Sequence, residues 1–329
     1  MTPRDIVVAT LSYDRPERVA RSFGDADMVF AGPSIKTAAT DWHPVGGARW
    51  ERTDEWGNLW ARVDASSKGE VIHGVLDRLD ALDDYELPRL DDPAGYEPVR
   101  RVRLDHPDRY VVGGLPGFAF NIARKLRRLD VYLTDLLADR PAVAALHDRI
   151  DDLLAGMIRR YAECGCDAVM ITEDWGTQQH LLIDPALWRD EFAPRFDRLC
   201  GLARSLGLSV WMHSCGQIEA IVPDLMTAGV DCLQFDQPEL HGLETLAAHQ
   251  DRGRITFWCP VDIQKTLQSR DEAVIRAAAR RMLDTLWRGR GGFIAGFYGD
   301  NASIGLDPVW QDHACDEFLR AGIADNYPE

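Results

Sequence analysis

The sequence is short of positive charge: 37 Lys and Arg residues stand against 53 Asp and Glu residues, a net charge of −16 over 329 residues. Nucleic-acid-binding proteins carry a basic face, and anionic membranes attract basic segments, so we expect neither partner. No apolar run approaches the roughly 18–20 residues of a membrane-spanning helix. The short apolar run at 6–11 follows Asp5 and ends in polar residues, unlike a signal peptide. We therefore expect a cytoplasmic protein.

Several catalytic motifs are also missing. There is no G-x-S-x-G, no P-loop and no G-x-G-x-x-G after an apolar run, so acyl transfer, nucleotide hydrolysis and dinucleotide binding lack their usual motifs. The seven cysteines are an odd number in a long acidic chain. We interpret them as packing residues, metal ligands or nucleophiles, not as a disulfide framework.

The C-terminal two-thirds alternates between two patterns. Helical stripes, such as the one at 143–161 that follows Pro141, separate short apolar runs. Near-continuous apolar runs are typical of strands covered on both faces, and this rhythm predicts parallel βα units in a closed barrel or an open doubly wound sheet. The predicted strands are Ala168–Ile171, Ser209–Met212, Cys232–Phe235, Ile255–Trp258 and Gly292–Phe297.

The first 105 residues differ in texture. They contain a predicted strand at Met28–Ala31, a Trp-rich polar stretch at Asp54–Val63 and an acidic, Pro-rich loop at Asp77–Pro98. We interpret residues 1–105 as an N-terminal elaboration, a hairpin and lid, on a barrel whose remainder is 106–329. No clean linker separates the two parts, so we expect one compact domain.

The strongest local signal is His213-Ser-Cys215-Gly216, directly after a predicted strand. The C-terminal ends of parallel strands face the active site in α/β folds. An imidazole and a thiolate two residues apart at such a position can bind one Zn²⁺ ion. The structural alternative is a packed cysteine beside a hydrogen-bonded histidine.

Zinc needs further ligands, and other predicted strands end in suitable donors. Asp236 follows the strand at 232–235, Cys259 follows the strand at 255–258, and Glu173 and Asp174 follow the strand at 168–171. His213, Cys215, Cys259 and one carboxylate would form a tetrahedral site of the catalytic type, with one exchangeable ligand. Alternatively, Cys259 is a buried apolar residue and Asp236 caps a loop.

A second polar cluster, residues 173–180 (EDWGTQQH), reads as a substrate-recognition loop, with a solvated loop as the alternative. Residues 298–301 (YGDN) follow the last predicted strand and supply polar groups near the same rim.

Three segments carry a resemblance to a known family: ITEDWGTQQHLLIDPALWRDEFAPRF at 171–196, MHSCGQIEAIVPDLMTAGVD at 212–231, and 291–294. Residues 113–136 and 54–60 add to it. The chain resembles the uroporphyrinogen decarboxylase-like superfamily, in particular its zinc-dependent, corrinoid-linked methyltransferases. The resemblance implies a (β/α)₈ TIM barrel with its site at the C-terminal rim.

Residue by residue, His213 and Cys215 match the H-x-C zinc pair of those methyltransferases. The family's further cysteine at the last strand is absent here, where residues 295–299 read AGFYG. Residues 231–236 are similar to a stretch that carries an acidic zinc ligand in cobalamin-independent methionine synthase, which favours Asp236. The decarboxylases' Arg-rich motif has only a poor counterpart at 14–18 (DRPER), so uroporphyrinogen is not the expected substrate.

The resemblance thus implies a zinc-dependent methyltransferase or O-demethylase of a small molecule, with a corrinoid protein as partner and a homodimer as assembly. It also leads to the following role assignments. The metal ligands are His213, Cys215, Cys259 and Asp236; the catalytic groups are Asp174 as general acid, Glu173 and Tyr298; the substrate contacts are Trp175, Gln178 and Asn301. The alternatives are a metal-independent lyase of a small acid and a non-catalytic small-molecule-binding barrel.

Overall fold

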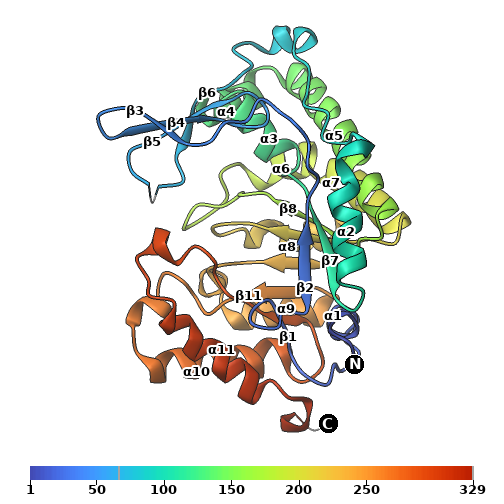
Figure 1. The fold of residues 1–329 in the computed structure, drawn as a ribbon, viewed down its shortest axis with the longest axis vertical. Helices are drawn as coiled ribbons and strands as arrows, with labels where there is room; N and C mark the ends of the chain where they lie inside the picture. Colours follow the sequence, from blue (N-terminus) through green and yellow to red (C-terminus); the bar gives the residue numbers. More distant parts are fainter. Residues whose placement is uncertain (66, 328–329) are drawn as a thin grey trace.

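Eight parallel strands form the main sheet of the computed structural model, which describes residues 1–65 and 67–327 (Figure 1). Their order is β1-β12-β11-β10-β9-β8-β7-β2. The two end strands meet where the Asp27 N–H donates to the Arg21 carbonyl at 3.0 Å. The sheet is therefore a nearly closed barrel, as predicted. The strands are β1 (Ala20–Arg21), β2 (Met28–Ala31), β7 (Tyr110–Gly114), β8 (Ala168–Thr172), β9 (Ser209–His213), β10 (Cys232–Gln234), β11 (Thr256–Cys259) and β12 (Phe293–Ala295).

Alternate strand residues point to opposite sides of the barrel wall, because side chains on a strand repeat every two residues. One set fills the interior, where all eight strands contribute to a separate apolar cluster that includes Tyr110, Trp211 and Trp258. The other set faces the surrounding helices. Ile6 and Val7 of α1 (Pro3–Ser12) join the interior cluster, so this helix closes the N-terminal end of the barrel. The opposite, C-terminal end is left as the accessible mouth.

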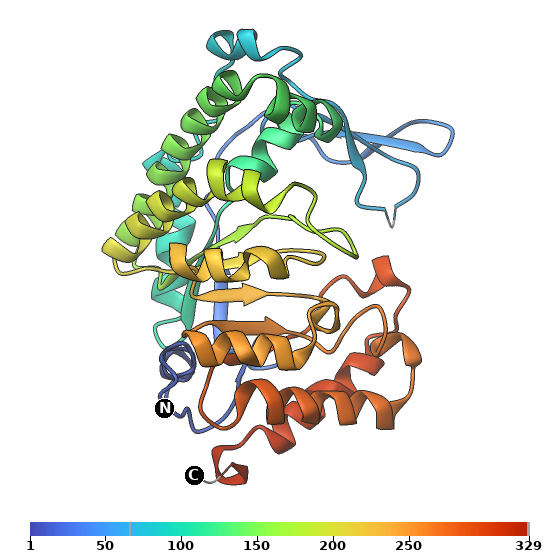
Figure 2. The same ribbon diagram turned by 180° about the vertical axis from the view of Figure 1, so that it is seen from behind.

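Helices cover the outside of the barrel, and α5 and α7 pack side by side along it (Figures 1 and 2). The stripe predicted at 143–161 lies within α5, whose N-cap Asp139 accepts a hydrogen bond from the Ala142 N–H. The helices are α2 (Glu97–Asp105), α3 (Ala119–Leu126), α4 (Leu129–Ala138), α5 (Arg140–Glu163), α6 (Pro185–Glu191), α7 (Ala193–Ser205), α8 (Val222–Ala228), α9 (Leu243–Arg252), α10 (Glu272–Met282) and α11 (Val309–Ala321). None of the helices in the described residues is long and apolar enough to cross a membrane.

A second sheet lies between β2 and β7 in the sequence and extends to one side of the barrel (Figure 1). Its antiparallel strands are β3 (His43–Gly46), β4 (Arg49–Thr53), β5 (Leu59–Arg62) and β6 (Glu70–His73). The buried carboxylate of Asp54 fixes the turn between β4 and β5, accepting hydrogen bonds from the Trp56 and Asn58 N–H groups and the Trp60 indole. The Trp-rich stretch thus forms a hairpin. The first two barrel strands precede it in the chain.

Candidate functional site

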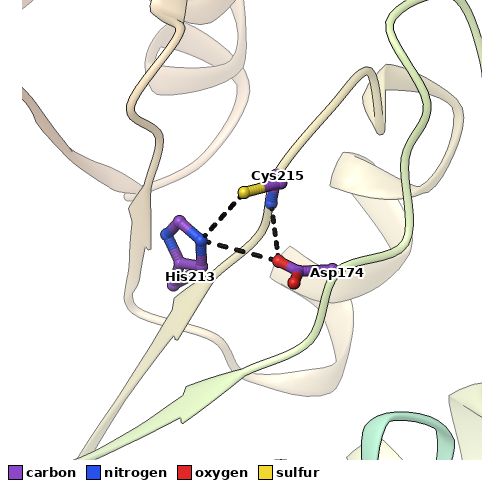
Figure 3. Close-up of side chains that lie close together, drawn as sticks. All are labelled: Asp174, His213 and Cys215. Carbon is purple, nitrogen blue, oxygen red and sulfur yellow. Dashed lines mark hydrogen bonds and ion pairs between the residues drawn. The ribbon is translucent and has the colours of Figure 1, made fainter. Parts of the chain in front are cut away.

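Three potential metal ligands meet at the mouth, at the C-terminal ends of β8 and β9 (Figure 3). His213 Nε2 lies 3.3 Å from Cys215 Sγ and 3.5 Å from Asp174 Oδ1. The Cys215 N–H donates to the same Asp174 oxygen at 3.0 Å. All three side chains reach solvent, and Cys215 is the one exposed cysteine of the seven. The site is therefore open to a small molecule.

The register of β8 and β9 creates this cluster. Thr172 pairs with His213, and the Glu173 N–H donates to the His213 carbonyl at 2.9 Å. The two chains then stay in contact past the strand ends, where a Cβ on Gly216 would lie 2.3 Å from the Gly176 backbone. Gly216 also has φ +75°, a conformation that favours glycine. This close approach holds Asp174 against Cys215.

Gln234 orients the His213 ring from β10. Its side-chain amide N–H donates to Asp236 Oδ1 at 2.9 Å, so its carbonyl oxygen faces the other way and accepts a hydrogen bond from His213 Nδ1. This arrangement places the proton of a neutral imidazole on Nδ1 and leaves the Nε2 lone pair directed at Cys215 and Asp174. Metal-binding histidines are typically held in this way through their second nitrogen.

The electrostatics of the cluster favour a cation. Desolvation, followed by the nearby Asp174 and Asp236 carboxylates, raises the pKa of the Cys215 thiol to about 12. Arg124 lies 3.5 Å from the second oxygen of Asp174, and Lys68 partly opposes the shift of the thiol. A divalent cation would reverse this balance, since it stabilises the thiolate directly.

The side chains of Glu173 and Trp175 flank Asp174 but point away from the cluster into the helical layer. Glu173 is fully buried, and its Oε1 accepts hydrogen bonds from the Phe118 and Asn121 N–H groups, at 2.5 Å and 3.1 Å. Burial raises the pKa of this carboxyl to about 8, despite those hydrogen bonds. The Glu173 side chain therefore positions the start of α3 and points away from the three ligand side chains.

Trp175 is also fully buried. Its indole stacks on Phe120, with ring centroids 4.1 Å apart, and packs edge-on against Trp188 and Phe192. This position in the core gives the side chain no access to a ligand at the mouth. Of the predicted substrate contacts in this loop, Gln178 is the exposed one, and its amide donates to Gln237 at 3.2 Å.

Beyond the last barrel strand, Tyr298 and Asn301 differ in exposure. Asn301 is buried and bonded to the Tyr298 carbonyl and to Gln311, at 3.0 Å and 2.6 Å, so its amide holds the local chain. The Tyr298 side chain is partly exposed, and its hydroxyl lies 3.3 Å from Ser303 Oγ. Lys68, from the turn between β5 and β6, also hydrogen-bonds Tyr298. The second sheet thus reaches the mouth.

Cys259 does not join the cluster. It is fully buried within the apolar layer outside the barrel wall, and burial raises the pKa of its thiol far above the usual range. The inward-pointing neighbour is Trp258, which packs against the interior cluster. Asp236 points inward and contacts Gln234, but lies outside the group of three ligands that the described residues bring together. The structure thus removes Cys259 from the ligand set.

Sequence reasoning placed Asp174 among the possible donors, preferred it as the general acid, and overlooked Gln234 and Arg124. A signal for Gln234 was available, since it is a glutamine within an otherwise apolar strand and two residues before Asp236. Arg124 had none, because its approach to Asp174 depends on how α3 packs on the barrel.

Comparisons with known proteins identify the family of the chain. The family model for uroporphyrinogen decarboxylase (URO-D) matches residues 67–297. This chain belongs to the uroporphyrinogen decarboxylase family. The match includes Asp174, His213 and Cys215, and it runs from the turn before β6 to the segment after β12. No curated protein matches the chain in sequence.

One solved structure shares the fold of the chain clearly, and another resembles it weakly. A methyltransferase from Methanosarcina mazei superposes with a TM-score of 0.60 at 16% identity, covering 80% of this chain and 76% of that one. The 3-keto-D-glucoside 4-epimerase YcjR from E. coli gives a TM-score of 0.40 at 13% identity, covering 70% and 86%. At these identities the likeness extends to the fold alone, and for the epimerase it is too weak to carry an argument.

Proposed function

We propose that the protein is a zinc-dependent methyltransferase or O-demethylase of a small molecule, with Asp174, His213 and Cys215 as its metal ligands. The single observation behind this proposal is the convergence of these three donors at the open mouth of the barrel. Membership of the uroporphyrinogen decarboxylase family supports an enzyme, and a barrel of this kind is also the fold of a methyltransferase.

The donors fit zinc in type and spacing. Nitrogen, sulfur and carboxylate oxygen are the ligands that zinc uses, and tetrahedral bonds of about 2.0–2.3 Å put neighbouring ligand atoms roughly 3.3–3.7 Å apart. The observed separations from His213 Nε2, 3.3 Å and 3.5 Å, lie in this range. Three protein ligands leave a fourth position for substrate, which is the pattern of catalytic zinc.

Zinc bound here would supply a stabilised thiolate or a Lewis acid for an ether oxygen. The chain's own residues prepare the site. Gln234 fixes the histidine tautomer, and Arg124 with the Cys215 N–H holds the Asp174 carboxylate in place. The partly exposed Tyr298 is the proposed acid for a leaving oxygen at the same mouth. A corrinoid protein is the proposed methyl-exchange partner.

Elemental analysis of the purified protein tests the metal. We expect about one zinc per chain, lost in His213→Ala and Cys215→Ala and retained in Cys164→Ala, a control at a buried cysteine that lies before β8, at the other end of the barrel. Methyl-cobalamin and a panel of methyl ethers then test transfer. Wild-type protein without zinc after incubation with the metal would contradict the proposal.

The activity for which the family is named favours one second candidate, a metal-independent decarboxylase acting on a small acid. In that case Asp174, paired with Arg124, would do the chemistry. Asp174→Asn would then abolish activity, while His213→Ala and Cys215→Ala would keep it.

A further inference from the structure

A groove of about 740 Å³ lies beside the three proposed metal ligands, between the second sheet and the helices α3 and α4. These elements lie together above the barrel in Figure 1. The groove combines cationic side chains with an apolar wall. Its principal lining residues are Trp60, Val71, Arg124, Lys125, Arg128 and Leu133.

The cationic side chains come from a basic segment, Arg124-Lys-Leu-Arg-Arg128, which is unusual in a chain of net charge −16. Arg127 turns inward, where it pairs with Asp135 at 2.8 Å and donates to the Leu76 carbonyl. The other three line the groove.

Two of the groove cations already have partners. Arg128 pairs with Asp130 at 3.1 Å, at the exposed rim. Arg124 contacts Asp174 at the longer distance of 3.5 Å and donates to the Asn121 side chain at 2.9 Å. Neither Asp174 nor Asp130 forms an ion pair with Lys125, which lies between the two arginines in the sequence.

Lys125 makes no ion pair with any described residue. It is one of four lysines in the chain, and its ammonium lies 5.9 Å from the centre of the Trp60 ring. Burial, followed by the charge of Arg124, lowers its pKa, and the carboxylates of Glu55 and Asp54 oppose this shift only in part. A partly buried cation without a directly paired carboxylate is unfavourable, so an anion entering the groove would be stabilised by Lys125.

We propose that this groove binds a small organic monocarboxylate with a planar apolar body, its carboxylate on Lys125 and Arg128 and its body against Trp60 and Leu133. Aromatic faces and aliphatic side chains favour a flat apolar ligand. The acidic residues Glu70 and Asp130 also line the groove, so it suits a single negative charge better than a polyanion.

Arg124 lines the groove and also contacts Asp174, one of the three proposed metal ligands. A carboxylate ligand would therefore lie next to the proposed zinc site. Its use as a substrate anchor rests on the proposed function, whereas its binding does not, because none of the three groove cations is a metal ligand. Metal-free protein is thus the right material for the test.

Isothermal titration calorimetry with benzoate tests the proposal, with benzyl alcohol as the uncharged analogue and inorganic phosphate as the anion without an apolar body. We expect benzoate to bind wild-type protein in preference to both. Lys125→Met, which keeps the aliphatic stem, should weaken benzoate binding at least about tenfold, whereas the exposed Lys265→Met should not. Equal binding of benzoate by the Lys125 and Lys265 variants, or tighter binding of phosphate, would overturn the proposal.

A second readout follows the wild-type chain, and a variant is needed only to assign one signal. Reductive methylation with ¹³C-formaldehyde labels the four lysines and the N-terminus, and Lys125→Arg assigns the signal. Saturating benzoate should raise the pKa of the Lys125 signal and leave that of Lys265 unchanged. An unmoved Lys125 signal would contradict the proposal whatever the zinc content, so its failure is distinguishable from failure of the proposed function.

Discussion

Cysteines lie at the C-terminal ends of two barrel strands, β9 and β11, but their side chains have opposite environments. Cys215 follows β9 on the inward-pointing side and meets His213 and Asp174, whereas Cys259 ends β11 on the outward side and is enclosed by apolar residues. Both lie at the rim. A position at the rim is therefore not enough to make a residue a ligand. Its side chain must also point to the inside of the barrel wall, and the two-residue repeat of a strand determines to which side it points.

The same alternation separates neighbours within one loop. Along β8 and beyond, Met170, Thr172 and Asp174 fall on the inward side, while Glu173 and Trp175 point to the helices. Inward residues should therefore govern ligand binding and outward residues should govern stability. The following predictions test this separation.

The largest effect is expected at Trp175. Trp175→Ala should lower the free energy of unfolding by about 3–5 kcal/mol, because it leaves a cavity among Phe120, Trp188 and Phe192. Urea denaturation measures this loss. Asp174→Ala, one residue away, should change the stability of metal-free protein by less than about 1 kcal/mol. Equal losses in the two variants would break the comparison.

Glu173 should make stability depend on pH. Its folded pKa, about 8, lies above the value of an unfolded glutamate, so the folded state holds a proton that the unfolded state releases. Stability from this group is therefore lost as pH rises from about 4.5 to 8. Relative to Glu173→Gln, the wild type should lose about 2 kcal/mol between pH 6 and pH 8, measured by urea denaturation. A difference that stays constant with pH would show that Glu173 is charged in the fold.

Gln234 should act on metal binding through His213. Gln234→Leu removes the acceptor for His213 Nδ1, and loss of such a partner typically costs 10–100-fold in metal affinity. Competition with a zinc chelator measures the change. Gln178→Leu, at the exposed end of the recognition loop, is the matched control and should bind zinc as the wild type does.

The smallest effect is expected at Cys259. Cys259→Ala removes one buried atom and should cost about 1 kcal/mol of stability, with zinc content unchanged. Cys215→Ala should show the reverse, with zinc lost and the stability of metal-free protein nearly unchanged. Thermal denaturation and elemental analysis of the two variants give both values. Loss of zinc in Cys259→Ala would restore Cys259 as a ligand.

The barrel was predictable because its strands are buried on both faces and recur at regular spacing. β2 has the predicted bounds, and β8 and β9 each end one residue later than predicted. The second sheet was not predicted in full, since its four short strands contain half-exposed and charged residues such as those of RWERT and EVIH. Its hairpin depends on the single buried carboxylate of Asp54, which no periodicity reveals.

Part of the site also followed from the sequence. His213 and Cys215 share one side of β9 by spacing alone, and the same rule extended to Trp258 would have assigned Cys259 to the other side. The contacts of Arg124 with Asp174 and of Lys68 with Tyr298 could not be derived, because they join elements far apart in the chain through tertiary packing.

A crystal structure of the zinc-soaked protein, with anomalous data at the zinc edge, tests the central claim most directly. We predict one strong peak within about 2.0–2.3 Å of Asp174 Oδ1, His213 Nε2 and Cys215 Sγ, and none beside Cys259. A peak on the Cys259 sulfur, or no peak at the mouth of fully zinc-exposed protein, would contradict the account.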